Sequence, residues 1–338
     1  MKAKEISGQA PGGKRTPLAE VLPLQTPFVV QIFPFYGCNF RCGYCIFSVD
    51  MAKRHFISDK VSMSMGLFEK AVDDMTGFGQ KIKVLRFVGI GEPLLHKKIA
   101  QMVAYAASKD VAHVLELLTN ASLLTPRMSD ALIAAGLTRL VVSIQGTSRR
   151  RYQEVCGATI EMAQLIDNLE YFYKNKGSAQ MYVKIIDCAL EGEKDENAFY
   201  EMFGDICDTI AVEHAVPIHA GVEFEHLLDS AKSAITQFGL PVKDVKICPQ
   251  PFFTMQINPD GNVVPCYSFE YPSIIGNVEN QTMVDIWNGK EFKSFRRNML
   301  DGIEMASGVC SRCSMIKYRL FPEDELANDA ERLKNHYE

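Results

Sequence analysis

The sequence predicts an α/β fold, a partial (β/α)6 barrel followed by a small C-terminal domain with a β-hairpin and helices. Apolar stretches of strand length alternate with segments in which apolar residues recur every three or four positions, from Phe28 onward. Strands connected in this way pair in parallel, and right-handed crossovers place the helices outside and curl the sheet. Six strands, where a complete barrel has eight, leave the barrel open.

The predicted strands and helices follow one another along the chain. The strands are 28–34, 82–88, 113–118, 140–144, 181–188 and 209–212. The helices are 64–77, 97–109, 126–135, 160–176 and 196–207. The first helix carries Leu67, Ala71 and Met75 at four-residue spacing, and Gly136 is the stop signal of the third.

We expect four regions besides the barrel, which occupies 28–216. They are a flexible segment at 1–27 with a short helix near 18–22, a linker at 217–247 with a helix near 226–238, a small domain at 248–320 and a C-terminal helix or tail at 321–338. In the small domain, Pro259-Asp260-Gly261 separates the apolar segments 252–257 and 263–266, which predicts a β-hairpin. A helical region at 283–300 follows.

Composition narrows the classes of partner. The chain has 338 residues and a net charge of −5, which gives no reason to expect nucleic acid or an anionic membrane as a partner. Its ten cysteines are too few for a disulfide scaffold. The N-terminus has no apolar signal region, and no apolar run is long enough to span a bilayer. We therefore expect a cytoplasmic protein with reduced thiols.

The chemistry is expected at a loop directly after the first strand. Cys38, Cys42 and Cys45 follow it with C-x3-C-x2-C spacing, and Tyr44 precedes the last cysteine. A [4Fe-4S] cluster ordinarily binds four cysteines, so three leave one iron open to a substrate or cofactor. Structural zinc requires four ligands, and three cysteines within eight residues make a poor disulfide framework. In β/α barrels the chemistry lies at the carboxyl ends of the strands, where this loop falls.

This pattern resembles the radical S-adenosylmethionine (radical SAM) superfamily. The resemblance implies that the open iron of a [4Fe-4S] cluster chelates S-adenosylmethionine (SAM) and that its cleavage gives a 5′-deoxyadenosyl radical. The second strand ends in Gly89-Ile90-Gly91-Glu92-Pro93, which is similar to the family's Gly-Gly-Glu-Pro motif and departs from it at Ile90. By the same resemblance, Gly89, Gly91 and Glu92 belong to the SAM site.

Polar residues interrupt two further strands where a barrel would expose them at its mouth. They are Asn120, Ser143 and Gln145. The resemblance implies that these three residues contact the ribose and carboxylate of SAM. It also implies that Tyr44 belongs to the SAM site. For each residue singly, a hydrogen bond at a strand end is the alternative.

A second set of cysteines lies in the small domain. Cys248, Cys266, Cys310 and Cys313 resemble the twitch or SPASM module of radical SAM enzymes. Full SPASM modules carry more cysteines and two auxiliary clusters, whereas four cysteines suffice for one auxiliary [4Fe-4S] cluster. A structural zinc ribbon is the alternative.

The catalytic residues are not identified by sequence. Cys156 could donate a hydrogen atom, although a free cysteine is more often a small buried apolar residue. Glu213, His214 and Asp187 fall at strand mouths and are alternative bases.

The resemblance to aminocyclitol dehydrogenases with one auxiliary cluster favours a radical SAM oxidoreductase, a dehydrogenase or epimerase. We expect a small polar substrate, a sugar or an aminocyclitol, and an external electron donor such as flavodoxin or ferredoxin. The alternatives are modification of a ribosomally synthesised peptide and a non-enzymatic scaffold that carries zinc or a cluster.

Overall fold

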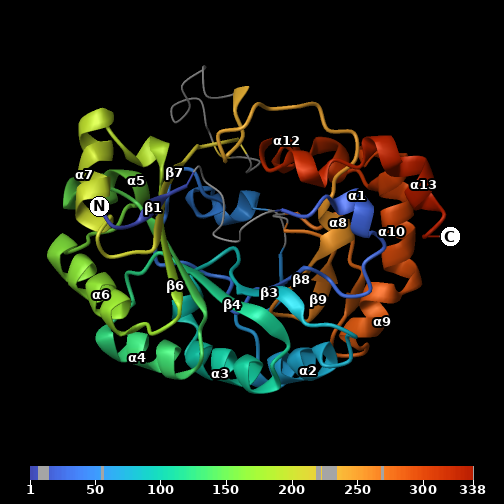
Figure 1. The fold of residues 1–338 in the computed structure, drawn as a ribbon, viewed down its shortest axis with the longest axis horizontal. Helices are drawn as coiled ribbons and strands as arrows, with labels where there is room; N and C mark the ends of the chain where they lie inside the picture. The colour runs from blue at the N-terminus through green and yellow to red at the C-terminus, as the bar shows by residue number, and fades with distance from the viewer. Residues whose placement is uncertain (7–14, 55–56, 218–221, 223–233, 268–269, 338) are drawn as a thin grey trace.

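The computed structural model describes residues 1–6, 15–54, 57–217, 222, 234–267 and 270–337. Within these ranges, ten strands form one sheet in the order β1-β7-β6-β5-β4-β3-β2-β8-β9-β10. The strands are β1 (Lys4–Glu5), β2 (Val29–Ile32), β3 (Ile82–Phe87), β4 (Ala112–Thr119), β5 (Arg139–Ile144), β6 (Gln180–Ile186), β7 (Thr209–Glu213), β8 (Thr254–Ile257), β9 (Asn262–Val264) and β10 (Gly276–Asn277). Figure 1 shows the sheet curving inside an outer layer of helices.

The six strands expected from the sequence, β2 to β7, pair in parallel with their neighbours in chain order. The prediction of a partial (β/α)6 barrel is therefore confirmed. Alternate residues along each strand are apolar and pack outward against the helices, as Phe87 of β3 does against Phe68 of α2 (Met65–Met75), with ring centroids 5.8 Å apart. The remaining residues point into the barrel, and several of them are charged.

The outer helices lie close to their predicted positions. In order they are α2, α3 (Ile99–Lys109), α4 (Pro126–Ala134), α6 (Met162–Asn175) and α7 (Glu193–Phe203). The Ser64 hydroxyl accepts a hydrogen bond from the Leu67 amide at 3.2 Å and fixes the start of α2. The sequence analysis did not predict α5 (Arg149–Cys156), whose first turn consists of three arginines and offers little apolar pattern.

The C-terminal part is helical beyond the hairpin. Its helices are α8 (Gln250–Phe253), α9 (Met283–Asn288), α10 (Lys290–Asp301), α11 (Ile303–Ala306), α12 (Met315–Tyr318) and α13 (Ala330–Lys334). The helical region predicted at 283–300 is two helices, because Gly289 has an extended backbone and ends α9. Figure 1 places α10 and α13 on the opposite side of the molecule from α6 and α7.

Two features of the sheet differ from the sequence-based expectation. β8 pairs in parallel with β2, so the predicted hairpin of the small domain continues the barrel sheet instead of standing apart. In the N-terminal segment 1–27, only a short helix was predicted, and the structure has it as α1 (Leu18–Val21). The same segment also contains β1, which pairs with β7 and was not predicted. The helix predicted near 226–238 lies largely outside the described residues. None of the described helices has the length and apolar character that a membrane crossing requires.

Candidate active site

The cysteine loop lies beyond the carboxyl end of β2 and is attached to the end of α5. The Arg41 amide donates to the Cys156 carbonyl at 2.9 Å, and the Gly43 amide donates to the Val155 carbonyl at 2.8 Å. The carbonyls of the last turn of a helix lack partners within the helix, so this loop satisfies them. The unpredicted α5 therefore supports the loop.

The three thiols of the loop are half-buried and free. The Cys38 sulfur accepts a hydrogen bond from the Phe40 backbone amide at 3.4 Å and lies 3.9 Å from the side-chain Nδ2 atom of Asn120. Burial raises the pKa of Cys38 to about 11 and also raises the pKa of Cys45. A thiolate in such a place needs a nearby positive charge, which an iron ion provides, so the donor set fits an iron–sulfur cluster.

Gly91 brings the Gly89–Pro93 turn into direct contact with the cysteine loop. Its φ is +150°, and a Cβ atom at this position would lie 2.1 Å from the Phe35 carbonyl oxygen. The next amide, that of Glu92, donates to the Gly37 carbonyl at 2.8 Å. Only glycine permits this approach, so the turn fixes the backbone that leads into Cys38.

The Glu92 carboxylate is buried and already occupied by protein donors. It accepts from the Leu94 amide at 2.9 Å, the Thr119 hydroxyl at 2.7 Å and the Asn120 amide at 2.7 Å. Burial raises the pKa of Glu92 to about 7. These bonds join the ends of β3 and β4, so the side chain positions Asn120 and is not free to accept from an ammonium group.

The other predicted SAM contacts gather around the cysteine loop. The Gln145 Oε1 atom accepts from the Tyr44 hydroxyl, and the Cys42 sulfur lies 3.6 Å from the same atom. The Gln145 Nε2 atom donates to the Ser143 carbonyl at 3.1 Å. On the other side, the Asn120 side chain donates to Asn39 of the loop at 3.0 Å. The structure thus brings Tyr44, Asn120, Ser143 and Gln145 together at the carboxyl ends of β4 and β5.

Cys156 lies behind the loop. Its thiol is buried and donates to the Tyr152 carbonyl at 3.0 Å. A hydrogen bond between the thiols of Cys42 and Cys156 raises the pKa of Cys42 and lowers that of Cys156. These contacts are those of a buried residue that packs behind the loop. They agree with the alternative given above, in which Cys156 is a small buried residue and not a hydrogen-atom donor.

The three candidate bases divide into two groups. The His214 Nδ1 atom lies 3.0 Å from an Asp187 carboxylate oxygen, whose partner oxygen accepts from the Ala215 amide at 2.9 Å. Glu213 binds the Lys184 ammonium at 2.7 Å and accepts from the Tyr182 hydroxyl at 3.3 Å. Asp187 and His214 therefore form a pair at the ends of β6 and β7, while Glu213 belongs to a separate ionic network.

Three of the four C-terminal cysteines lie close together. The neighbouring thiols of Cys313 and Cys310 contribute to raising the pKa of Cys248, although burial is the larger cause. The Cys248 amide donates to the Met299 sulfur at 3.3 Å, which places it against α10. Cys266 follows β9 and is half-buried, and its place beside the other three stays a prediction. Among the described residues, no three His, Cys, Asp or Glu side chains converge on a site for a single metal ion.

A cavity of about 440 Å³ occupies the interior of the barrel. Side chains from the inner faces of β2 to β8 line it, together with Arg15, Gln237, Tyr267 and Arg319. Tyr267 contacts Phe33, with ring centroids 5.7 Å apart, and a charge on Cys45 contributes to raising its pKa, after the larger effect of burial. Tyr267 therefore lies between the cavity and the cysteine loop.

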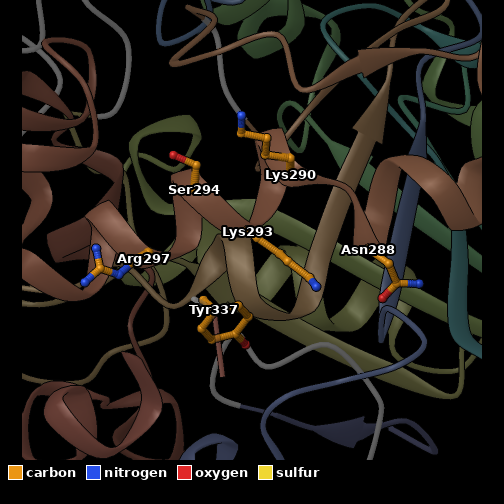
Figure 2. Close-up of a pocket in the computed structure, with 6 residues that line it drawn as sticks. All are labelled: Asn288, Lys290, Lys293, Ser294, Arg297 and Tyr337. Carbon is orange, nitrogen blue, oxygen red and sulfur yellow. The ribbon is translucent and has the colours of Figure 1, made fainter. Parts of the chain in front are cut away.

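A second hollow, of about 630 Å³, lies on the outer surface of α10 and is more open to solvent. Figure 2 shows Lys290, Lys293 and Arg297 projecting from one helix around it. None of the predicted site residues lines this hollow, whereas Glu213, one of the candidate bases, lines the barrel cavity. The barrel cavity is therefore the candidate substrate site.

Residues 32–202 match the family model of the radical SAM superfamily, which is half of the chain. The chain belongs to this superfamily and is a radical SAM enzyme. Residues 248–314 match a second model, the SPASM iron–sulfur cluster-binding domain, and cover all four C-terminal cysteines. Iron–sulfur clusters and SAM are accordingly its cofactors, as predicted.

Similar proteins extend over most of the chain. A tungsten-containing aldehyde ferredoxin oxidoreductase cofactor-modifying protein of Pyrococcus furiosus is 25% identical over 77% of this chain and 80% of its own length. The SAM-dependent 2-deoxy-scyllo-inosamine dehydrogenase of Niallia circulans is 21% identical over 82% of this chain and 89% of its own. The structure of Streptococcus suis SuiB bound to its precursor peptide SuiA has a TM-score of 0.61 at 15% identity, covering 81% of this chain and 67% of that one.

The sequence analysis missed the charged residues inside the barrel. Arg86, Glu116, Arg139 and Lys184 each lie in a strand that is otherwise mostly apolar. A single charged side chain within such a strand was the available signal, because it marks an inner face that is not filled by apolar packing.

Proposed function

We propose that the chain oxidises or epimerises a small polar molecule with hydroxyl groups, such as a sugar or an aminocyclitol. The observation that carries this proposal is the cavity of about 440 Å³ inside the barrel, which polar and charged side chains line together with apolar ones, and which Tyr267 borders on the side of the cysteine loop. This volume suits a monosaccharide-sized ligand, at the lower end of ligand sites in general.

Cys38, Cys42 and Cys45 are the proposed ligands of the first cluster. When bound, this cluster would supply the electron that cleaves SAM into methionine and a 5′-deoxyadenosyl radical, and that radical would take a hydrogen atom from a carbon of the substrate. Tyr44, Asn120, Ser143 and Gln145 orient SAM at the loop, supported by their bonds to it and to one another. Glu92, Gly89 and Gly91 hold the turn that presents backbone atoms to the same ligand.

Oxidation to a carbonyl also requires that a hydroxyl proton and a second electron leave the substrate. We assign proton removal to His214, because its bond with Asp187 fixes the orientation of the ring. Of the three candidate bases, only Glu213 is among the residues that line the cavity, but its carboxylate is held by Lys184, so it is the second candidate. Cys248, Cys266, Cys310 and Cys313 are the proposed ligands of an auxiliary cluster, which would accept the second electron.

The names of the two relatives support a small substrate. One acts on an aminocyclitol and the other is named for modifying a cofactor. Modification of a ribosomally synthesised peptide is the runner-up, since the fold is shared with SuiB. A zinc-bearing scaffold is the third reading. An external protein such as flavodoxin or ferredoxin is the proposed electron donor.

The test uses protein that is purified and reconstituted without oxygen. We expect about eight irons per chain, reductive release of 5′-deoxyadenosine, and transfer of deuterium into it from one of a panel of C-deuterated sugars and aminocyclitols. A Cys42→Ala variant is the matched control and should release none. Deuterium transfer from a peptide but from no small molecule would reverse the order of the two enzymatic readings. Bound zinc without release of 5′-deoxyadenosine would overturn both.

A further inference from the structure

The inner face of the barrel carries more positive than negative charge. In register across neighbouring strands lie Gln31, Arg86, Glu116 and Arg139. Glu116 accepts from Arg86 and also from the Arg139 Nη1 atom, at 2.9 Å. Although burial alone would raise the pKa of Glu116, the two guanidinium groups hold it below its usual value. One carboxylate thus faces two permanent cations, and one positive charge is left over.

Arg319 adds a second cation, beside Tyr267 and within electrostatic range of Glu213 and of Cys313, a proposed ligand of the auxiliary cluster. Its Nε atom donates to the Gln237 side chain at 2.8 Å, and its guanidinium carbon lies 5.3 Å from the centre of the Tyr267 ring. Gln237 in turn donates to Glu213 at 2.7 Å, but Glu213 is already paired with Lys184. In the part of the chain that the structure describes, neither terminal nitrogen of Arg319 has a protein acceptor.

The third excess charge is Lys83, whose exposed side chain lies at the edge of the cavity. The Lys83 ammonium lies over the Phe28 ring, 3.3 Å from its centre, and burial lowers the Lys83 pKa, with a smaller effect of Arg15. Arg15 is neutralised by Asp324. Among the described residues that line the cavity, six cationic side chains therefore face three carboxylates.

This excess is specific to the cavity, because the chain as a whole carries a net charge of −5. A half-buried cation without an anionic partner, such as Arg319, is costly, and a bound anion removes that cost. Guanidinium groups also match carboxylate and phosphate in geometry, since they donate two parallel hydrogen bonds.

We propose that the substrate is an anion, a small hydroxyl-bearing molecule with a phosphate or carboxylate group that binds the terminal nitrogens of Arg319. This inference rests on the proposed function and narrows it, because it favours an acidic or phosphorylated sugar over a cationic aminocyclitol. At Arg319 the anionic group lies beside Tyr267, which holds the rest of the molecule toward the cysteine loop and the bound SAM.

The test measures binding to the anaerobic holoenzyme with SAM by titration calorimetry. The probes are glucose, glucosamine, glucose 6-phosphate and glucuronate. We expect the phosphate or the carboxylate probe to bind at least about tenfold more tightly than glucose, and glucosamine to bind most weakly. The better of the two anionic probes identifies the anionic group.

Variants test whether the preference for an anionic probe over glucose depends on Arg319. Arg319→Gln should abolish it without changing iron content, melting temperature or the affinity for glucose, and Arg319→Lys should restore part of it. Lys293→Gln, in the hollow on α10, is the matched control and should bind as wild type. The proposal is overturned if neither anionic probe exceeds glucose, if the preference survives Arg319→Gln, or if Lys293→Gln removes it. Release of 5′-deoxyadenosine by the same preparation decides the proposed function independently of this result.

Discussion

Replacing Gly91 by alanine tests whether the Gly89–Pro93 turn holds the cysteine loop in place. A Cβ atom at Gly91 would lie 2.1 Å from the Phe35 carbonyl oxygen and 2.8 Å from the Gly37 carbonyl oxygen. Both atoms belong to the backbone directly before Cys38, so one of the two segments must move by about 1 Å to reach an ordinary contact. The φ of +150° adds roughly 1–3 kcal/mol of backbone strain for a residue with a side chain.

Strain and overlap together should lower the free energy of unfolding by about 3 kcal/mol or more and displace the cysteine loop. We expect Gly91→Ala to lose most of the iron bound by the first cluster and to release little 5′-deoxyadenosine, while it keeps the auxiliary iron. The assays are iron and sulfide per chain, the midpoint of chemical unfolding, and 5′-deoxyadenosine in an anaerobic reaction.

Gly66→Ala is the matched control. Gly66 lies in α2, and a Cβ atom there meets nothing within 4 Å. Alanine at a helical position stabilises by roughly 0.5–1 kcal/mol relative to glycine, so this variant should be at least as stable as wild type and fully loaded with iron. A Gly91→Ala protein with wild-type iron content, stability and SAM cleavage would refute the reasoning.

Three further predictions follow from the site. Burial raises the Glu92 pKa to about 7 from an ordinary 4.5, so the folded chain keeps a proton that the unfolded chain releases, and stability falls as pH rises between these values. Glu92→Gln should remove up to about 3 kcal/mol of this dependence in urea unfolding at pH 5 and 7.5, and an unchanged dependence would contradict it. Cys310→Ala should lower iron from about eight to about four per chain, whereas full loading would exclude it as a ligand. His214→Gln should still release 5′-deoxyadenosine but form at least about a hundredfold less oxidised product, and equal product would remove it as the base.

The sequence predicts the parts of this molecule that depend on local pattern. The six parallel strands and the spacing of Cys38, Cys42 and Cys45 could be read directly, because periodicity and short spacing are local properties. Strand β1 could not be predicted from the sequence, because its two residues have exposed side chains and pair only through their backbones. The Arg86–Glu116–Arg139 layer also escaped prediction, because it depends on the register of strands that are 23 to 30 residues apart.

The pairing of β8 with β2 has the largest consequence that sequence could not show. Because the two strands are parallel, Cys38 follows the carboxyl end of one, while Cys248 precedes the amino end of the other. Cys38 and Cys248 therefore lie beyond opposite ends of the same strand pair, which four residues make about 13 Å long. The cavity extends along this pair from Gln250 and Thr254 to Tyr267.

With the proposed ligands, a substrate in this cavity would have the first cluster and SAM beyond one end of the strand pair and the auxiliary cluster toward Cys248 at the other. Hydrogen abstraction and electron removal can then occur on different sides of one bound molecule. An epimerisation returns a hydrogen atom to the carbon radical and needs no electron acceptor, whereas an oxidation requires one. A proposed electron acceptor at Cys248, beyond the opposite end of this strand pair from Cys38, favours oxidation over epimerisation as the outcome of the proposed function.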